Sequence, residues 1–144
     1  MYKRQHIIQI ILPALKNNKI VICDRFIDST LVYQGIARNL GIEALKDIQK
    51  SIINDAIPNL TIFFDINPKE SLKRIKAIRT KKELNRLDLE DLSFHEKVYE
   101  GYQQLIKEEP KRIKRIDATK DLNNVCNQVK TLVIKFLEDS NENI

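Results

Sequence analysis

The chain has 144 residues, of which 42% are hydrophobic and 31% are charged. This length and composition indicate one soluble domain with a real hydrophobic core, and the three glycines and four prolines exclude a collagen-like or linker-like chain. No apolar run approaches the roughly 20 residues that a membrane-spanning helix needs, and no small-residue cleavage site follows the basic N-terminus. We therefore expect a cytoplasmic protein without a membrane partner.

The formal net charge of +5 favours an anionic partner such as a nucleic acid, a nucleotide or an acidic membrane surface, without choosing among them. No zinc-finger or RNA-binding signature accompanies the basic residues, which argues against a nucleic-acid-binding domain. The cysteines, Cys23 and Cys126, lie far apart and have no CxxC partner. This spacing favours buried thiols over a disulfide or a zinc site.

The first third of the chain predicts two helices separated by a strand. Residues 1–16 carry isoleucines and leucines in one stripe at helical spacing, and Pro13 should kink the last turn of this helix. Residues 20–23 form a short β-branched run without polar alternation, which predicts a strand buried on both faces. A second amphipathic helix follows Gly41.

The middle of the chain predicts a strand, a helix and a loop. Residues 60–64 are typical of a second buried strand, which ends at Asp65. Residues 67–70 combine a helix cap, a proline at the first helical position and an early glutamate, so a helix should begin there. Residues 78–93 are highly charged and have no clear period, which predicts a loop.

The last third predicts a helix, a strand and a final helix. Apolar residues at helical spacing follow Phe94, and residues 112–117 are typical of a third strand that is more exposed than the other two. Thr119 or Asp121 should then cap the last helix. The polar tail behind it is expected to fray.

Strands that alternate with helices indicate a parallel sheet and an α/β fold. Such sheets bind ligands beyond the carboxyl ends of their strands, and each predicted strand is followed there by an aspartate: Asp24, Asp65 or Asp117. An aspartate after a strand often merely caps the next helix. That interpretation is weakest for Asp24, because Arg25 and several polar side chains come directly behind it.

Residues 23–35, C-D-R-F-I-D-S-T-L-V-Y-Q-G, closely resemble the D-R-[YFH]-x-x-S-x-x-x-Y-Q-G signature of bacterial thymidylate kinases. Residues 58–65 (P-N-L-T-I-F-F-D) are similar to the P-D-L-T-x-x-L-D strand of that family. Residues 94–102 (F-H-E-K-V-Y-E-G-Y) are similar to its F-H-x-x-V-x-x-G-Y helix. Residues 116–119 (I-D-A-T) match the end of a family strand, and residues 13–15 match a P-A-L upstream. The resemblance therefore covers nearly the whole chain.

The resemblance implies a P-loop-kinase-like fold, in which helices flank a parallel sheet in three layers. The family begins with a strand and a G-x-x-x-x-G-K-[ST] loop whose backbone amides and lysine hold the phosphates of ATP. This chain has glycines only at Gly35, Gly41 and Gly101, none of them followed by lysine. It therefore resembles the C-terminal two-thirds of the family, truncated at its N-terminus, with a partial kinase domain at residues 1–138 and a polar tail at 139–144.

The resemblance also implies an acceptor site around Arg25. The planar guanidinium of Arg25 would grip the phosphate of dTMP, and Asp24 would organise the acceptor or magnesium-bound water beside the transferring group. Tyr33 would pack on the deoxyribose and disfavour a 2′-hydroxyl, with Gln34 and Ser29 completing the pocket. A structural salt bridge for Arg25 and a core role for the Tyr33 ring remain open as alternatives.

Two further sets of residues follow from the resemblance. Lys3 falls where the family usually has an arginine that binds the thymine base, although lysine lacks the fork of arginine. Residues 78–93 correspond to the lid over ATP, with Arg74, Arg79 and Arg86 as the arginines that would neutralise charge and exclude water. A charge run of this kind is also typical of a solvated face.

The resemblance therefore implies a transferase of nucleotide biosynthesis that uses ATP and Mg²⁺ to phosphorylate dTMP, with Asp24, Arg25 and Arg86 as catalytic residues. No protein metal site is expected, because Mg²⁺ would bind together with ATP. Asp24 is the one protein residue that could contact it. The family pairs through helices, so we expect a homodimer. The alternative is a non-catalytic remnant or subunit that binds dTMP or a partner chain. We expect no turnover from these 144 residues alone.

Overall fold

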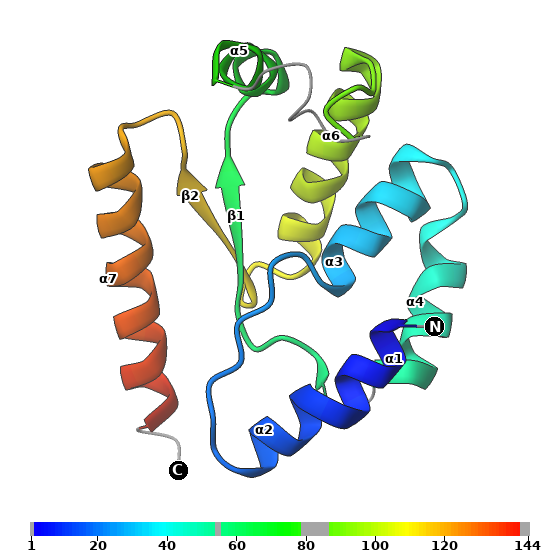
Figure 1. The fold of residues 1–144 in the computed structure, drawn as a ribbon, viewed down its shortest axis with the longest axis vertical. Coiled ribbons are helices and arrows are strands. Elements are labelled where there is room, and N and C mark those ends of the chain that lie inside the picture. The colour runs from blue at the N-terminus through cyan, green and yellow to red at the C-terminus, as the bar shows by residue number, and fades with distance from the viewer. Residues whose placement is uncertain (1, 54–55, 79–86, 142–144) are drawn as a thin grey trace. The chain divides into compact units, whose positions relative to one another are not determined.

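The computed structural model describes residues 2–53, 56–78 and 87–141 (Figure 1). The chain divides into two compact units, an N-terminal unit, Met1–Pro58, and a C-terminal unit, Asn59–Ile144. No helix in the described ranges is long and apolar enough to cross a membrane.

A helical segment opens the N-terminal unit, as the apolar stripe predicts. It consists of α1 (Tyr2–His6), a π-helical turn η1 (Ile7–Ile11) and α2 (Leu12–Lys16). The irregularity lies one turn before the predicted kink, because the Pro13 ring in a regular helix would clash with the carbonyl of Gln9, four residues earlier. Gln9 lies in the wider π turn, where Leu12 N–H donates instead to Ile7 O.

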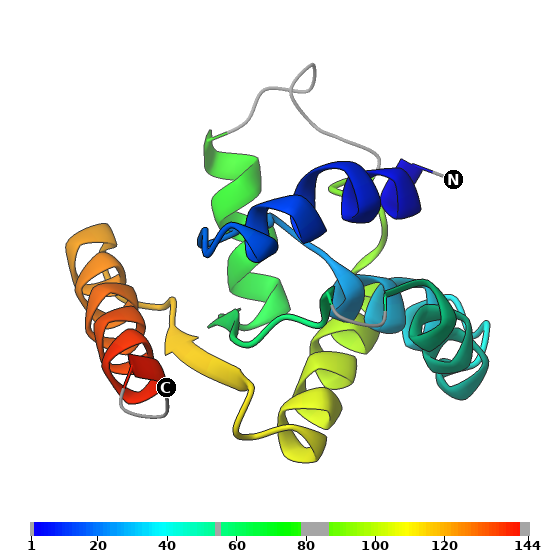
Figure 2. The ribbon, with the colours of Figure 1, turned by 90° about the horizontal axis from the view of Figure 1, so that it is seen from below.

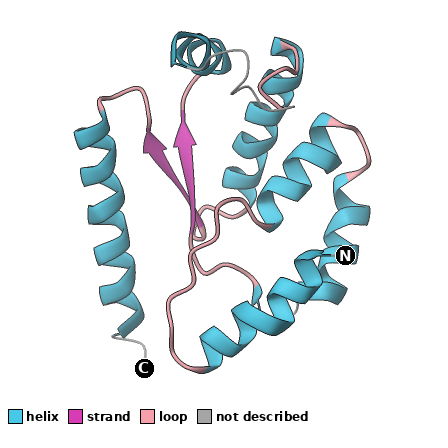
Figure 3. Ribbon diagram, viewed as in Figure 1, coloured by secondary structure: helices cyan, strands magenta, loops and turns pink. Residues whose placement is uncertain are grey.

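The prediction of a buried strand at residues 20–23 is wrong. These residues form an irregular segment, drawn as a loop in Figure 3, and Ile20 and Ile22 are 72% and 91% exposed. A strand needs a hydrogen-bonded neighbour, and the described part of this unit contains no strand. The β-branched composition favours a strand, but the described part of the unit offers no second strand with which these residues could pair.

The described part of the N-terminal unit contains further helical elements: α3 (Ile27–Thr30), a π-helical η2 (Leu31–Ala37) and the predicted α4 (Ile42–Ile53). Gly35 permits the close approach of η2 to α4, because a Cβ at this position would lie 3.2 Å from the Ile42 Cα. One hydrophobic cluster of the unit consists of buried Ile7, Ile11, Ile53 and Ala56.

The C-terminal unit contains the two other predicted strands, β1 (Thr61–Asp65) and β2 (Ile113–Asp117). They pair in parallel, with Thr61 opposite Ile113 and Asp65 opposite Asp117. The connection between them runs through α5 (Pro68–Ile78) and α6 (Leu92–Glu108), and α7 (Leu122–Asn141) follows β2. In both Figure 1 and Figure 2, α6 and α7 lie on opposite sides of the strand pair. This arrangement confirms the α/β class.

Side-chain caps set the beginnings of the three helices of the C-terminal unit that the structure describes. Asn67 Oδ1 accepts from Lys69 N–H at 2.9 Å, as predicted for α5. Asp91 Oδ1 accepts from Phe94 N–H at 2.8 Å, so α6 begins two residues before the apolar stripe. Asp121, rather than Thr119, caps α7 through Asn124 N–H at 3.1 Å. The end of α7 includes residues 138–141, which were expected to fray.

Two burial predictions are wrong. Strand β2 was expected to be the more exposed strand, but Ile113 and Ile116 are 1% and 4% exposed because α6 and α7 both contact this strand. Cys23 and Cys126 were expected to be buried thiols, and both are exposed. Cys23 lies in the irregular segment at 20–23, and Cys126 faces outward on α7.

Candidate functional site

The signature segment, residues 23–35, begins as an exposed bend and continues as α3 and η2. Asp24 and Arg25 are both exposed, and helix α3 starts two residues later. Arg25 has a φ of 62°, in the left-handed region. For a residue with a side chain this conformation costs about 1–3 kcal/mol, and strain of this kind is typical of functional sites.

The guanidinium of Arg25 lies over the ring of Tyr33, with its Cζ 4.2 Å from the ring centroid. A cation–π contact at an exposed position contributes about 0.5–1 kcal/mol, which offsets part of the backbone strain. Among the described residues no carboxylate pairs with Arg25, so the structure does not support the alternative of a structural salt bridge. The contact leaves the planar edge of the guanidinium, which carries its N–H donors, available for an anion.

The other predicted acceptor residues divide by burial. Tyr33 is half-buried and Ser29 is buried, whereas Gln34 and Asp24 are exposed. The start of α3 is tied to α4 by Gln49 Nε2, which donates to Ile27 O at 3.4 Å. The structure therefore brings Arg25 into contact with Tyr33, and the start of the helix between them is held in place by α4.

Several predicted site residues fall outside the described part of the molecule. Lys3 belongs to α1, but its side chain lies outside the description. Arg79 and Arg86 lie in the range 79–86, as does half of the predicted lid. Their roles stay predictions.

In the C-terminal unit, Asp65 and Asp117 end the two paired strands side by side. Both oxygens of Asp65 have partners: Tyr99 Oη donates to Oδ1 at 2.9 Å, and Arg115 Nε lies 3.2 Å from Oδ2. Arg115 also donates to Gln103 on α6. The hydrogen bond to Asp65, together with burial, raises the pKa of Tyr99. Asp65 therefore joins β1 to β2 and α6.

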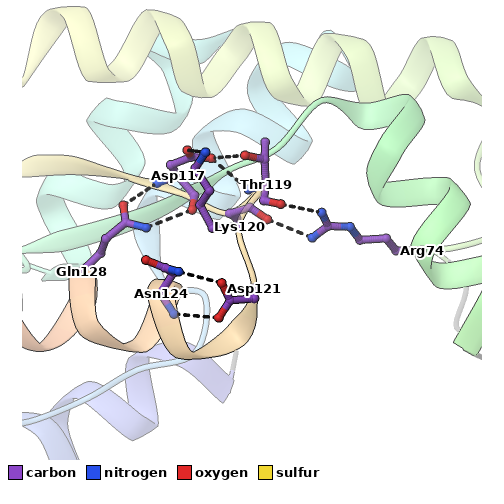
Figure 4. A network of polar contacts seen from close by, with 8 residues as sticks. Arg74, Asp117, Thr119, Lys120, Asp121, Asn124 and Gln128 are labelled. Atoms are coloured by element: carbon purple, nitrogen blue, oxygen red, sulfur yellow. Dashed lines mark hydrogen bonds and ion pairs between the residues drawn. The ribbon is translucent and has the colours of Figure 1, made fainter.

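Asp117 organises the connection from β2 to α7 (Figure 4). Its carboxylate accepts from Thr119 N–H at 2.9 Å and from Thr119 Oγ1 at 2.6 Å, and these bonds hold its pKa below the usual value. Gln128 of α7 binds both backbone groups of Asp117, accepting from its N–H at 3.1 Å and donating to its carbonyl at 3.2 Å.

Arg74 of α5 joins the same network (Figure 4). Its Nη1 donates to Ala118 O at 2.9 Å and its Nη2 donates to Thr119 O at 3.0 Å. Its Nε pairs with Glu70 at 3.3 Å. Every nitrogen of this guanidinium thus has a partner within the fold, in contrast to Arg25.

A hollow of about 410 Å³ lies beyond the carboxyl ends of β1 and β2, which we call the strand-end hollow. Tyr99 and Arg115 line it together with the two aspartates. Sequence reasoning missed both residues, because Tyr99 occupies a variable position of the F-H-x-x-V-x-x-G-Y motif and Arg115 looks like an exposed strand residue. Their contacts join segments 34 or more residues apart, for which the sequence carries no local signal.

The described residues contain no cluster of three or more side chains suited to hold a metal ion. Asp24 is a single exposed carboxylate. Mg²⁺ commonly binds proteins through one or two carboxylates together with nucleotide phosphates, so the residues fit Mg²⁺ only when phosphates carry it.

Comparison with known proteins assigns most of the chain to one family. The thymidylate kinase family model matches residues 1–129. The chain is 48% identical over 137 residues to a thymidylate kinase of Oceanobacillus iheyensis, covering 95% of this chain and 60% of that protein. It is 45% identical over 136 residues to one of Staphylococcus haemolyticus, covering 94% of this chain and 66% of that protein. A thymidylate kinase of Mycoplasma capricolum is 46% identical over 138 residues, covering 96% of this chain and 64% of that protein. The chain thus spans 60–66% of the length of these relatives.

Proposed function

The chain belongs to the thymidylate kinase family, and we propose that it takes part in the transfer of the terminal phosphoryl group of ATP to dTMP. In this reaction a phosphate oxygen of dTMP attacks the γ-phosphorus, the bond to the leaving ADP breaks, and dTDP forms. The protein contributes little covalent chemistry to such a transfer, so its residues act mainly by positioning the substrates and neutralising their charge.

The observation that carries the proposal is the Arg25 guanidinium, held 4.2 Å from the centroid of the Tyr33 ring within the signature segment. Arg25 is exposed, has no carboxylate partner among the described residues, and has a strained backbone. A structural arginine would be paired within the fold, as Arg74 is. These features support Arg25 as the ligand of the dTMP phosphate, with Tyr33 beneath the guanidinium.

The neighbouring residues complete the proposed acceptor site. Asp24 provides a carboxylate for the acceptor or for magnesium-bound water, and Ser29 and Gln34 lie on the helical elements that carry Tyr33. Lys3 would donate one hydrogen bond to the thymine base. Mg²⁺, when bound with ATP, neutralises the phosphates during transfer.

The donor side of the reaction requires more than these 144 residues contain. The three glycines form no phosphate-binding loop, so we propose that turnover needs such a segment in addition to this chain. Arg79 and Arg86 remain the proposed lid arginines. If this segment is not supplied, the chain would act as a dTMP-binding polypeptide.

We also propose a homodimer and a cytoplasmic location. The exposed Ile8 and Ile10 on the first helical segment support pairing through that segment, because a water-facing apolar helix is stabilised by a second copy.

Calorimetry with dTMP and thymidine tests the acceptor site. Loss of a charge-assisted contact costs roughly 1.5–3 kcal/mol, so Arg25→Ala should weaken dTMP binding about ten- to a hundredfold. Thymidine has no phosphate, and its affinity should stay unchanged. Lys19→Ala, which removes one exposed positive charge from the same unit, is the matched control. Unchanged dTMP affinity in Arg25→Ala would reject the acceptor site, and an equal loss for thymidine would reject the phosphate contact.

A further inference from the structure

Arg74 connects two parts of the C-terminal unit that are far apart in the sequence. It lies on α5, and its two terminal nitrogens donate to the carbonyls of Ala118 and Thr119, which are 44 and 45 residues away. These carbonyls belong to the turn that follows β2, which we call the 118–119 turn. A fork with both arms on main-chain carbonyls holds a turn in one orientation more firmly than a single donor does.

The 118–119 turn is held from its other sides as well. Ala118 N–H donates to Asp65 O at 3.0 Å, and Thr119 N–H donates to the Asp117 carboxylate at 2.9 Å. Gln128 of α7 fixes the backbone of Asp117 itself. The turn is therefore connected to β1, α7 and α5, and the contact with α5 shown in Figure 4 is made by Arg74.

The position of the turn gives this arrangement a functional meaning. Thr119 and Asn67, the residue that caps α5, both line the strand-end hollow. Ligands of parallel α/β sheets bind beyond the carboxyl ends of the strands, which is where the hollow lies. A shift of the 118–119 turn relative to α5 would therefore change the shape of this edge.

The hydrogen bonds of Arg74 conflict with the role that the sequence predicts for it. A lid arginine needs free N–H donors to bind phosphate oxygens. In Arg74 the two terminal nitrogens bind backbone carbonyls, and Nε pairs with Glu70. A guanidinium cannot bind these carbonyls and a phosphate through the same fork edge.

We propose that Arg74 is a positioning residue, which fixes the 118–119 turn against α5 and thereby shapes the edge of the sheet where a nucleotide binds. The fork edge that binds the two carbonyls is therefore not free to bind the phosphates of that nucleotide. This inference rests on the proposed function only for the identity of the ligand, because the contact between Arg74 and the turn is a property of the fold.

Amide hydrogen exchange in the 144-residue chain tests the contact without any ligand. The variants are Arg74→Ala, Arg74→Lys and the matched control Lys73→Ala, which removes the neighbouring exposed charge from the same helix. Lysine keeps the charge but cannot reach both carbonyls with a planar fork. Arg74→Ala and Arg74→Lys should both speed exchange at the Ala118 and Thr119 amides by about tenfold, the scale of one lost charge-assisted hydrogen bond. Lys73→Ala should not.

Calorimetry with Mg·ATP on the same variants, each joined to an N-terminal segment that carries a phosphate-binding loop, tests the positioning role. Arg74→Ala and Arg74→Lys should weaken Mg·ATP binding to a similar extent and leave dTMP binding unchanged. If Arg74→Lys keeps the wild-type affinity for Mg·ATP, Arg74 acts through its charge. If amide exchange at the 118–119 turn is unchanged in both variants, Arg74 does not hold the turn. Either result overturns the inference. If the joined wild-type chain binds no Mg·ATP, that result would contradict the positioning role and the proposed donor, while amide exchange would still decide whether Arg74 holds the turn.

Discussion

The hydrogen bond from Tyr99 to Asp65 provides a quantitative prediction for the C-terminal unit. Tyr99→Phe removes the hydroxyl that donates to Asp65 at 2.9 Å and keeps the ring, whose centroid lies 6.2 Å from that of Phe63. A hydrogen bond to a charged group contributes roughly 1.5–3 kcal/mol when fully protected from water. The Asp65 side chain is 18% exposed and shared with Arg115, so we expect Tyr99→Phe to lower the free energy of unfolding by about 1 kcal/mol.

A double-mutant cycle separates this bond from the other contacts of Tyr99 and Asp65. Urea unfolding of Tyr99→Phe, Asp65→Ala and the double variant should give a coupling free energy of about 1 kcal/mol. If the two substitutions are additive within about 0.3–0.5 kcal/mol, the hydrogen bond does not stabilise the fold and the reasoning is refuted.

The same bond predicts a pH dependence with a defined sign. The bond to Asp65 raises the pKa of Tyr99 above its ordinary value of 10.0, so the fold favours the protonated phenol. Its contribution to stability is therefore fully present below pH 10 and is lost as the pH rises through the raised pKa. Because the chain has four tyrosines and no tryptophan, absorbance near 295 nm follows their ionisation directly. One tyrosine should ionise at a higher pH than the others. This late step in the absorbance titration should be absent from Tyr99→Phe and present in Tyr102→Phe.

Three further predictions concern other parts of the chain. Gly35→Ala should lower the free energy of unfolding by about 1–2 kcal/mol in urea titrations, because its Cβ would lie 3.2 Å from the Ile42 backbone; an unchanged midpoint would show that η2 and α4 do not pack this closely. Bonds from Asn124 lower the pKa of Asp121 below 3.8, so its contribution to stability is present at neutral pH and is lost as the pH falls through that lower pKa. Asp121→Ala should therefore be less stable than wild type at pH 7, with the difference shrinking in acid-unfolding curves. The 144 residues alone should not convert dTMP to dTDP in a coupled assay with ATP and Mg²⁺, whereas activity that Arg25→Ala abolishes would show that they suffice.

The sequence predicts the C-terminal unit well because its signals there are local and consistent. The apolar run at residues 60–64 and the cap at Asn67 place β1 and the start of α5 within one residue. Residues 20–23 show the limit of such signals. Their β-branched composition favours a strand as strongly as that of residues 60–64 does. A strand also needs a hydrogen-bonded neighbouring strand, and local composition does not show whether one is present.

The candidate site could be predicted only where its residues lie close together in the sequence. Arg25 and Tyr33 belong to one motif, and the structure brings them into contact. The cation–π geometry and the left-handed backbone of Arg25 could not be read from that motif. The carbonyls that Arg74 binds lie 44 and 45 residues away, so the family resemblance that assigned Arg74 to the lid carried no information about them.

The central claim, that Arg25 binds the phosphate of dTMP, can be tested by following the Arg25 side-chain Nε–H signal in ¹H–¹⁵N spectra during titration with dTMP. A phosphate contact predicts that this signal shifts strongly and exchanges more slowly with water. The change should saturate together with calorimetric binding, while the Nε–H signal of Arg115, which pairs with Asp65, stays in place. Saturation by dTMP that leaves the Arg25 signal unmoved would contradict the account.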